Sequence, residues 1–409
     1  MARTRKWRLR WAAGATAVMT AAVLSAIGPP AQAAPAGRIR GAGEPGSVDG
    51  SYIVTLKGDG RPLSAAGARA VAASYGARIS HTYGTVLHGF AVRADPGRAR
   101  LLAADPRVSS VVQDTRVTFA GAPGTGAAPG RVRSHPPSWG LDRIDQRGRP
   151  LDGRYTAPGP QGAGVTVYVI DTGVRITHRD FDGRASYGWD FVDGDATAQD
   201  GNGHGTLVAG TVAGSTYGVA KRARIVAVRV LDDQGAGSTA QVIAGIDWVT
   251  RHARKPAVAN LSLGGYANDR LDAAVRDSIA SGVTYTVAAG NYGLPASLYS
   301  PARVAQALTV GATGRDDARA PFSDTGPSLD LFAPGVDITS TSYTGDLARA
   351  TCSGTSMASP HAAGAAALYL AEHPRDTPAQ VGKALVRQAV RGKVSNAGPG
   401  SPNRLLNVG

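Results

Sequence analysis

Four polar side chains in this chain are of the types needed to cleave an acyl bond. Asp171 ends the apolar run VTVYVID, His204 lies among glycines in DGNGHGTLVAG, and Ser356 lies in SGTSMA. A serine hydroxyl becomes nucleophilic when an imidazole takes its proton, and a carboxylate must set the tautomer of that imidazole. Asn291, at the end of TYTVAAGN, has an amide that can donate to the oxyanion formed by the attack.

Each motif alone has a simpler interpretation. Asp171 can be a turn residue, Ser356 a helix cap and Asn291 a turn former. Their joint placement favours catalysis, because ligands bind at the carboxyl ends of strands in open α/β sheets. Two of the residues follow such strands, while His204 and Ser356 begin predicted helices after glycines. The Ser356 N–H, at a positive helix end, is then a second oxyanion donor.

The elements that must position these residues alternate between strand and helix from about residue 138 onward. The strands are near-continuous apolar runs, including RIVAVRVL, AVANLSL and ALTVGAT, which is typical of a parallel sheet covered on both faces. Helices are predicted over 203–214, 238–253, 269–282 and the run after Ser356. This pattern predicts an α/β fold with helices on both faces of a mostly parallel sheet.

A smaller unit precedes the α/β domain. Residues 51–119 read as strand, helix, two strands, helix and a last strand over 108–114, the βαββαβ order of a ferredoxin-like α+β sandwich. It is flanked by stretches rich in Gly, Pro and Ala, 34–50 and 120–137, which we interpret as linkers. The α/β domain then occupies 138–409.

The N-terminus and the composition indicate export. Residues 1–33 combine a basic start, an apolar stretch and AQA before Ala34, which is typical of a signal peptide; a membrane anchor is the alternative. Cys352 is the single cysteine, so no intramolecular disulfide can form and stability must come from the core or from bound ions. The net charge of +14 lies mostly in residues 1–133, which argues against a nucleic-acid partner.

The motifs together resemble those of the subtilisin-like serine proteases (subtilases), in their proteinase K-like branch. VYVIDTGV, GNGHGTLVAGTVAG and SGTSMASPHAAG resemble the aspartate, histidine and serine motifs in the family's order. The stretch 228–249 and the motifs NLSLGG and AAGN add further matches, and residues 52–119 resemble the inhibitory propeptide of the family.

The resemblance implies a role for each site residue. Ser356 is the nucleophile, His204 the general base and then acid, Asp171 the orienting carboxylate and Asn291 the oxyanion donor. Two motifs form the substrate-binding site. Its backbone edge consists of Ser262, Leu263 and Gly264, and the wall of the first specificity pocket consists of Ala288, Ala289 and Gly290. Small residues on both sides of this pocket suit apolar or aromatic side chains.

The resemblance also implies a secreted, monomeric serine endopeptidase of broad specificity that cleaves proteins and peptides. Its propeptide acts as an intramolecular inhibitor and is removed by self-cleavage within 120–137. No cofactor is required for the chemistry and no membrane partner is expected after signal removal. Structural calcium is possible, with unknown ligands, because Gly314 replaces a calcium-binding aspartate, although Asp316 and Asp317 follow closely.

Several further residues admit two interpretations. The acidic stretch Asp190, Asp193, Asp195 and Asp200 could bind a cation, but we favour a solvated loop. We expect His178 and His361 to be structural and Cys352 to be a buried apolar filler, although its position near Ser356 also allows a redox role. The position three residues after His204 is Leu207, which leaves His204 as the only candidate base in its motif.

Two other functional classes remain as alternatives. A pseudoprotease would bind peptides along SLGG without cleaving them, and loss of a triad member would indicate it; none is lost. An esterase of the α/β-hydrolase type would carry G-x-S-x-G and the order Ser, acid, His. The observed GTSMA and the order Asp, His, Ser argue against that class.

Overall fold

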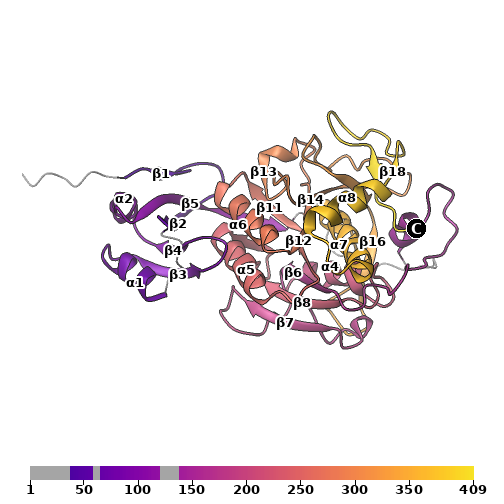
Figure 1. The fold of residues 1–409 in the computed structure, drawn as a ribbon, viewed down its shortest axis with the longest axis horizontal. Helices are drawn as coiled ribbons and strands as arrows, with labels where there is room; N and C mark the ends of the chain where they lie inside the picture. Colours follow the sequence, from indigo (N-terminus) through magenta and orange to yellow (C-terminus); the bar gives the residue numbers. More distant parts are fainter. Residues whose placement is uncertain (1–36, 59–64, 120–137) are drawn as a thin grey trace, which may run out of the picture. The chain divides into compact units, whose positions relative to one another are not determined.

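The computed structural model describes residues 37–58, 65–119 and 138–409 (Figure 1). The predicted signal peptide (1–33) and the segment predicted to hold the maturation cleavage (120–137) lie outside the described residues.

The N-terminal unit has the predicted βαββαβ order. Its antiparallel sheet runs β5-β2-β4-β3, and one apolar cluster that includes Tyr52, Val54, Phe90 and Val111 fills the space between this sheet and its two helices. The elements are β2 (Ser47–Leu56), α1 (Ala65–Ala73), β3 (Arg78–Tyr83), β4 (Gly89–Arg93), α2 (Pro96–Ala103) and β5 (Val108–Phe119).

Two boundaries of this unit differ from the sequence prediction. Part of the predicted linker 34–50 is strand: β1 (Ile39–Arg40) pairs with β5, and β2 already begins at Ser47. The last strand continues beyond 114 to Phe119. Both extensions have the same physical reason. The backbone N–H and C=O groups pair with neighbouring strands, so these segments are strand even though the sequence there offers few apolar side chains.

The α/β domain is built on a nine-stranded sheet in the order β18-β19-β15-β14-β12-β10-β6-β8-β7, parallel except for the β18–β19 pair. Its strands are β6 (Thr166–Asp171), β7 (Ala185–Asp190), β8 (Arg224–Arg229), β10 (Ala257–Leu261), β12 (Thr284–Ala288), β14 (Leu308–Thr313), β15 (Leu331–Pro334), β18 (Val390–Arg391) and β19 (Arg404–Leu405). This confirms the predicted fold class.

Helices cover both faces of this sheet. Along β6, Val167 and Val169 join one core cluster while Tyr168 and Ile170 join a second, because successive side chains of a strand point to opposite faces. The first cluster contains the apolar residues of α4 (His204–Ala213) and α7 (Thr355–Glu372), and the second contains those of α5 (Thr239–His252) and α6 (Asp269–Ala280). Helices α3 (Trp139–Ile144) and α8 (Pro378–Gln388) complete the domain (Figure 1).

Candidate active site

The imidazole and the carboxylate predicted from the sequence are hydrogen-bonded. His204 Nδ1 lies 2.8 Å from Asp171 Oδ1, and both side chains are buried. Asp171 is the last residue of β6 and His204 the first of α4, so the carboxyl end of a central strand faces the start of a helix. Because Nδ1 is held by the carboxylate, the other ring nitrogen, Nε2, is the atom available for proton transfer.

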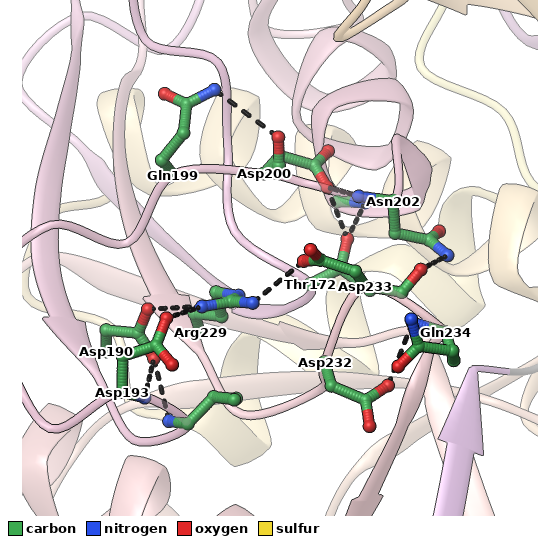
Figure 2. A network of polar contacts seen from close by, with 12 residues as sticks. Thr172, Asp190, Asp193, Gln199, Asp200, Asn202, Arg229, Asp232, Asp233 and Gln234 are labelled. Atoms are coloured by element: carbon green, nitrogen blue, oxygen red, sulfur yellow. Dashed lines mark hydrogen bonds and ion pairs between the residues drawn. The ribbon is translucent and has the colours of Figure 1, made fainter.

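Side chains that were not predicted to take part in catalysis determine where α4 begins. The buried carboxylate of Asp200 accepts from the Thr172 hydroxyl at 2.9 Å (Figure 2). It also accepts from the Thr206 N–H at 2.9 Å, and Thr172 Oγ1 accepts from the Gly205 N–H. The His204 N–H donates to Asn202 Oδ1. These bonds satisfy helix N–H groups that have no partner inside the helix. Asp200 therefore connects the residue after Asp171 with the first turn that carries His204.

Ser356 is the second residue of α7 and is fully buried. Ser356 Oγ and His204 Nε2 are both buried and have no hydrogen-bond partner among the described residues. The Ser356 carbonyl accepts from Ser262 Oγ at 2.8 Å, and Ser262 Oγ accepts from the Asn260 amide. The two atoms that general-base catalysis requires are thus not engaged elsewhere within this part of the chain.

The orientation of the Asn291 amide follows from its neighbours. Asn291 Oδ1 accepts from the backbone N–H of Thr355 at 2.8 Å and from its hydroxyl at 2.9 Å. With the oxygen held by the residue directly before Ser356, the amide nitrogen is the end that can donate to an oxyanion.

The end of β5 lies between two strands of the α/β domain. Thr118 pairs with Gly264 of β11 (Leu263–Tyr266) and also with Ala236 of β9 (Ala236–Ser238), both antiparallel. The Phe119 ring stacks on the His204 imidazole with centroids 4.5 Å apart. An extended peptide added to an exposed sheet edge is the binding mode expected for a substrate backbone.

A cavity of about 110 Å³ lies beside this peptide. Leu263, Gly264 and the three predicted wall residues Ala288, Ala289 and Gly290 line it. Ser262 does not line it and lies just before β11, where its hydroxyl supports the Ser356 carbonyl instead. Five of the six predicted substrate-binding residues are therefore at this cavity.

Buried carboxylates hold the N-terminal unit against α5. Asp247 Oδ1, in α5, accepts the N–H groups of Gly84, Thr85 and Val86 at 3.1, 2.7 and 3.1 Å. Asp114 Oδ1, in β5, accepts the Ala240 N–H at the start of α5. Burial raises the pKa of Asp114.

The acidic stretch is only partly solvated, because Asp193 and Asp195 are exposed whereas Asp190 and Asp200 are buried. The Arg229 guanidinium donates to Asp190 at 2.6 Å, to Asp193 at 2.7 Å and to Asp233 at 2.8 Å (Figure 2). Asp190 is 1% exposed and Asp200 is 3% exposed, which corrects our expectation of a solvated loop for these two residues. The physical reason is that a guanidinium provides the compensating charge that buried carboxylates require.

The second candidate calcium site, at Asp316 and Asp317, also contains an ion pair. Asp317 receives two hydrogen bonds from the buried Arg143 guanidinium, at 2.6 and 3.1 Å. No group of three or more His, Cys, Asp or Glu side chains suited to a metal ion occurs among the residues that the structure describes. The side chains at these two places do not fit a cation site.

The other predicted structural residues are buried in the protein. His361 is fully buried with Nδ1 2.7 Å from the Met357 carbonyl, and burial lowers its pKa to about 4. His178 Nε2 contacts the Ala348 carbonyl at 2.8 Å. Cys352, in β17 (Arg349–Cys352), is 7% exposed and belongs to the first core cluster. A structural role for all three agrees with these positions.

Comparison with known proteins identifies the family. Residues 162–409 match the model of the subtilase family, and residues 51–120 match that of the peptidase inhibitor I9. The chain belongs to the subtilase family and is a serine endopeptidase preceded by an I9 propeptide domain.

Similar proteins cover most of the chain. An extracellular serine proteinase of Thermus sp. (strain Rt41A) is 47% identical over 406 residues, covering 94% of this chain and 96% of the relative. The alkaline serine exoprotease A of Vibrio alginolyticus is 48% identical over 332 residues, covering 81% of this chain and 60% of the relative. The crystal structure of a cold-adapted subtilisin-like serine proteinase matches with a TM-score of 0.65 and 53% identity, covering 66% of this chain and 97% of that one.

No helix in the described part of the chain is long and apolar enough to cross a membrane.

Proposed function

We propose that Ser356, His204 and Asp171 form a catalytic triad that cleaves peptide bonds through an acyl-enzyme. The observation that carries this proposal is the 2.8 Å bond between His204 Nδ1 and Asp171 Oδ1, with His204 Nε2 left for the Ser356 hydroxyl. His204 takes the hydroxyl proton as Ser356 attacks the carbonyl, and it then protonates the leaving amine. The Asn291 amide and the Ser356 N–H stabilise the oxyanion of the tetrahedral intermediate.

We further propose that the chain is made as an exported, self-processing zymogen. The end of β5 pairs with β9 and β11 as a substrate would, which supports intramolecular inhibition by the N-terminal unit. Phe119 covers His204 at the last described residue before 120–137, which supports a cleavage shortly after it, within that segment. The name of the Thermus relative and the signal-like residues 1–33 support export.

For specificity, we propose that the 110 Å³ cavity receives the side chain before the scissile bond. Its lining consists mostly of small, aliphatic and aromatic residues, beside three neutral polar ones, and this supports a preference for apolar and aromatic side chains.

The test is expression of the precursor with Ser356→Ala beside the unchanged chain. The unchanged chain should lose its N-terminal unit through a cut within 120–137 and then cleave casein. The variant should remain uncut and inactive, because loss of the nucleophile lowers kcat about 10⁶-fold relative to the unchanged chain. Normal processing of Ser356→Ala would exclude self-cleavage, and casein cleavage by it would exclude Ser356 as the nucleophile.

A further inference from the structure

A buried acid lies directly behind one wall of the specificity cavity. Asp324, between β14 and β15, is 0% exposed. Its Oδ1 accepts the N–H groups of Tyr292 at 2.9 Å and Leu294 at 2.8 Å, and its own N–H donates to the Gly290 carbonyl at 3.0 Å. Asp324 is therefore bonded to the segment that follows the predicted wall residues.

The second carboxylate oxygen touches the wall itself. A Cβ built on Gly290 would lie 2.1 Å from Asp324 Oδ2, so this oxygen occupies the space where any larger residue would put its side chain. Gly290 lines the cavity, and no charged side chain does so among the described residues. The backbone of one glycine thus separates a carboxylate from a cavity that no charged side chain lines among the described residues.

No cation or hydrogen-bond donor among the described residues pairs with Asp324 Oδ2. The nearest cation, Arg319, directs its guanidinium to the backbone carbonyls of Asn396 and Ser323 rather than to Asp324. Burial raises the pKa of both Tyr292 and Tyr299, and the charge at Asp324 contributes to the rise at both aromatic residues of the cavity.

The ionisation of Asp324 falls in an accessible pH range. Burial raises the pKa of Asp324 to about 6, while the N–H groups of residues 292–294 and the charge of Arg319 lower it. The carboxyl group is consequently neutral below this pH and negative above it.

We propose that Asp324 is a specificity-determining residue, whose carboxylate raises the cleavage rate for a positively charged side chain in the cavity relative to an apolar one of equal length. This inference rests on the proposed assignment of the cavity to the residue before the scissile bond. A unit charge several ångströms away across a protein wall is worth roughly a tenfold change in relative rate, after screening. The apolar preference expected from the lining is then pH-dependent, and basic side chains gain at neutral and alkaline pH.

The test uses two peptides that differ only before the scissile bond, one with lysine and one with norleucine, which has the same chain without the ammonium group. The ratio of their kcat/KM values is measured with the mature enzyme from pH 5 to 9. Dividing the two values cancels the ionisation of His204. We expect the lysine-to-norleucine ratio to rise roughly tenfold with rising pH, with a midpoint near the Asp324 pKa of about 6.

Asp324→Asn is the matched variant, because the amide oxygen can still accept from Tyr292 and Leu294. Its ratio should be independent of pH and should stay near the low-pH value of the unchanged enzyme. Asp330→Asn is the control. Burial also raises the pKa of Asp330 to about 6, but its Oδ2 accepts the Thr309 N–H at the opposite, amino end of the parallel strands. This control should keep the pH-dependent step.

Three results would overturn the inference: a ratio without a step in the unchanged enzyme, a step that survives in Asp324→Asn, or an equal loss for both peptides in that variant. The first readout needs no variant, so misfolding of Asp324→Asn leaves the inference testable. If the peptides are cleaved but their lysine-to-norleucine ratio shows no step with pH, only the role of Asp324 is rejected. If neither peptide is cleaved, the proposed function is rejected.

Discussion

At the scale of single residues, the His–Asp pair depends on a buried carboxylate that takes no part in the chemistry. Asp200 accepts from Thr172, next to Asp171, and from Thr206, in the first turn of α4. Burial raises the pKa of Asp200, and the N–H and hydroxyl groups around it offset part of that effect. Asp200 is therefore a positioning residue that fixes the distance between the two members of the pair.

Asp200→Asn tests this role. An amide group cannot accept on both sides, so the start of α4 should shift and kcat should fall by about 10²-fold, the order expected for a misplacement near 1 Å. KM should change little because the cavity residues are untouched. Asp195→Asn is the control, since Asp195 is exposed and accepts from the Thr197 N–H. Steady-state kinetics with one peptide measure both variants, and equal kcat values would contradict a positioning role.

The sequence predicts the residues that carry the chemistry better than those that support them. Asp171 and His204 are predictable because each lies at a strand end or helix start within a glycine-rich motif. Phe119 is not, because it lies beyond the predicted strand and owes its position to pairing with β11, far along the chain. Ser262 reads as substrate edge, yet its hydroxyl is used beneath the Ser356 carbonyl. Asn260, an amide inside the apolar run AVANLSL, is the sequence signal for that support.

At the scale of elements, Arg229 joins the loop after β7 to the loop between β8 and β9. Its guanidinium binds Asp190 and Asp193 on one side and Asp233 on the other. The Asp233 carbonyl in turn accepts from the Asn202 amide, just before α4 (Figure 2). One arginine thus connects the strand that binds the peptide backbone with the helix that carries His204. The carboxylates alone do not predict this, because an arginine and a metal ion satisfy them equally well.

Arg229→Met should destabilise the α/β domain. Removing the guanidinium leaves Asp190 buried without a partner charge, a change that costs about 3–5 kcal/mol. Urea unfolding in the inactive Ser356→Ala background measures it. The double variant Arg229→Met with Asp190→Asn should recover most of the loss, since it removes the unpaired charge and keeps an acceptor for the Val192 N–H. A single variant as stable as its parent would show that Arg229 contributes no net stabilisation.

At the scale of the whole molecule, we expect the proposed latency to depend on contacts remote from the segment 120–137. Asp247 in α5 accepts three successive N–H groups from the turn between β3 and β4, and Asp114 of β5 accepts an N–H at the start of the same helix. Each carboxylate lies on the opposite partner, so reciprocal polar bonds add to the apolar contacts between the N-terminal unit and α5. Such buried, multiply bonded carboxylates are expected to slow dissociation of the cleaved unit.

Asp247→Ala in the full chain should therefore shorten the lag before activity appears. The three N–H groups lose their acceptor, and dissociation of the cleaved N-terminal unit should accelerate at least about tenfold. The lag is followed by peptide hydrolysis and by gel analysis of the same samples. Arg251→Ala is the control, because this half-exposed residue contacts only the other oxygen of Asp247. An unchanged lag in Asp247→Ala would place control of latency elsewhere.

The central claim is that Ser356 is the nucleophile activated by His204, and covalent labelling tests it most directly. The processed protein is treated with a fluorophosphonate at neutral pH, digested and mapped by peptide mass spectrometry, beside a His204→Ala variant from which an added protease has removed the N-terminal unit. We predict one adduct, on Ser356, at a rate at least about 10³-fold higher than in the variant. An adduct on another residue, or equal labelling without His204, would contradict the proposed triad.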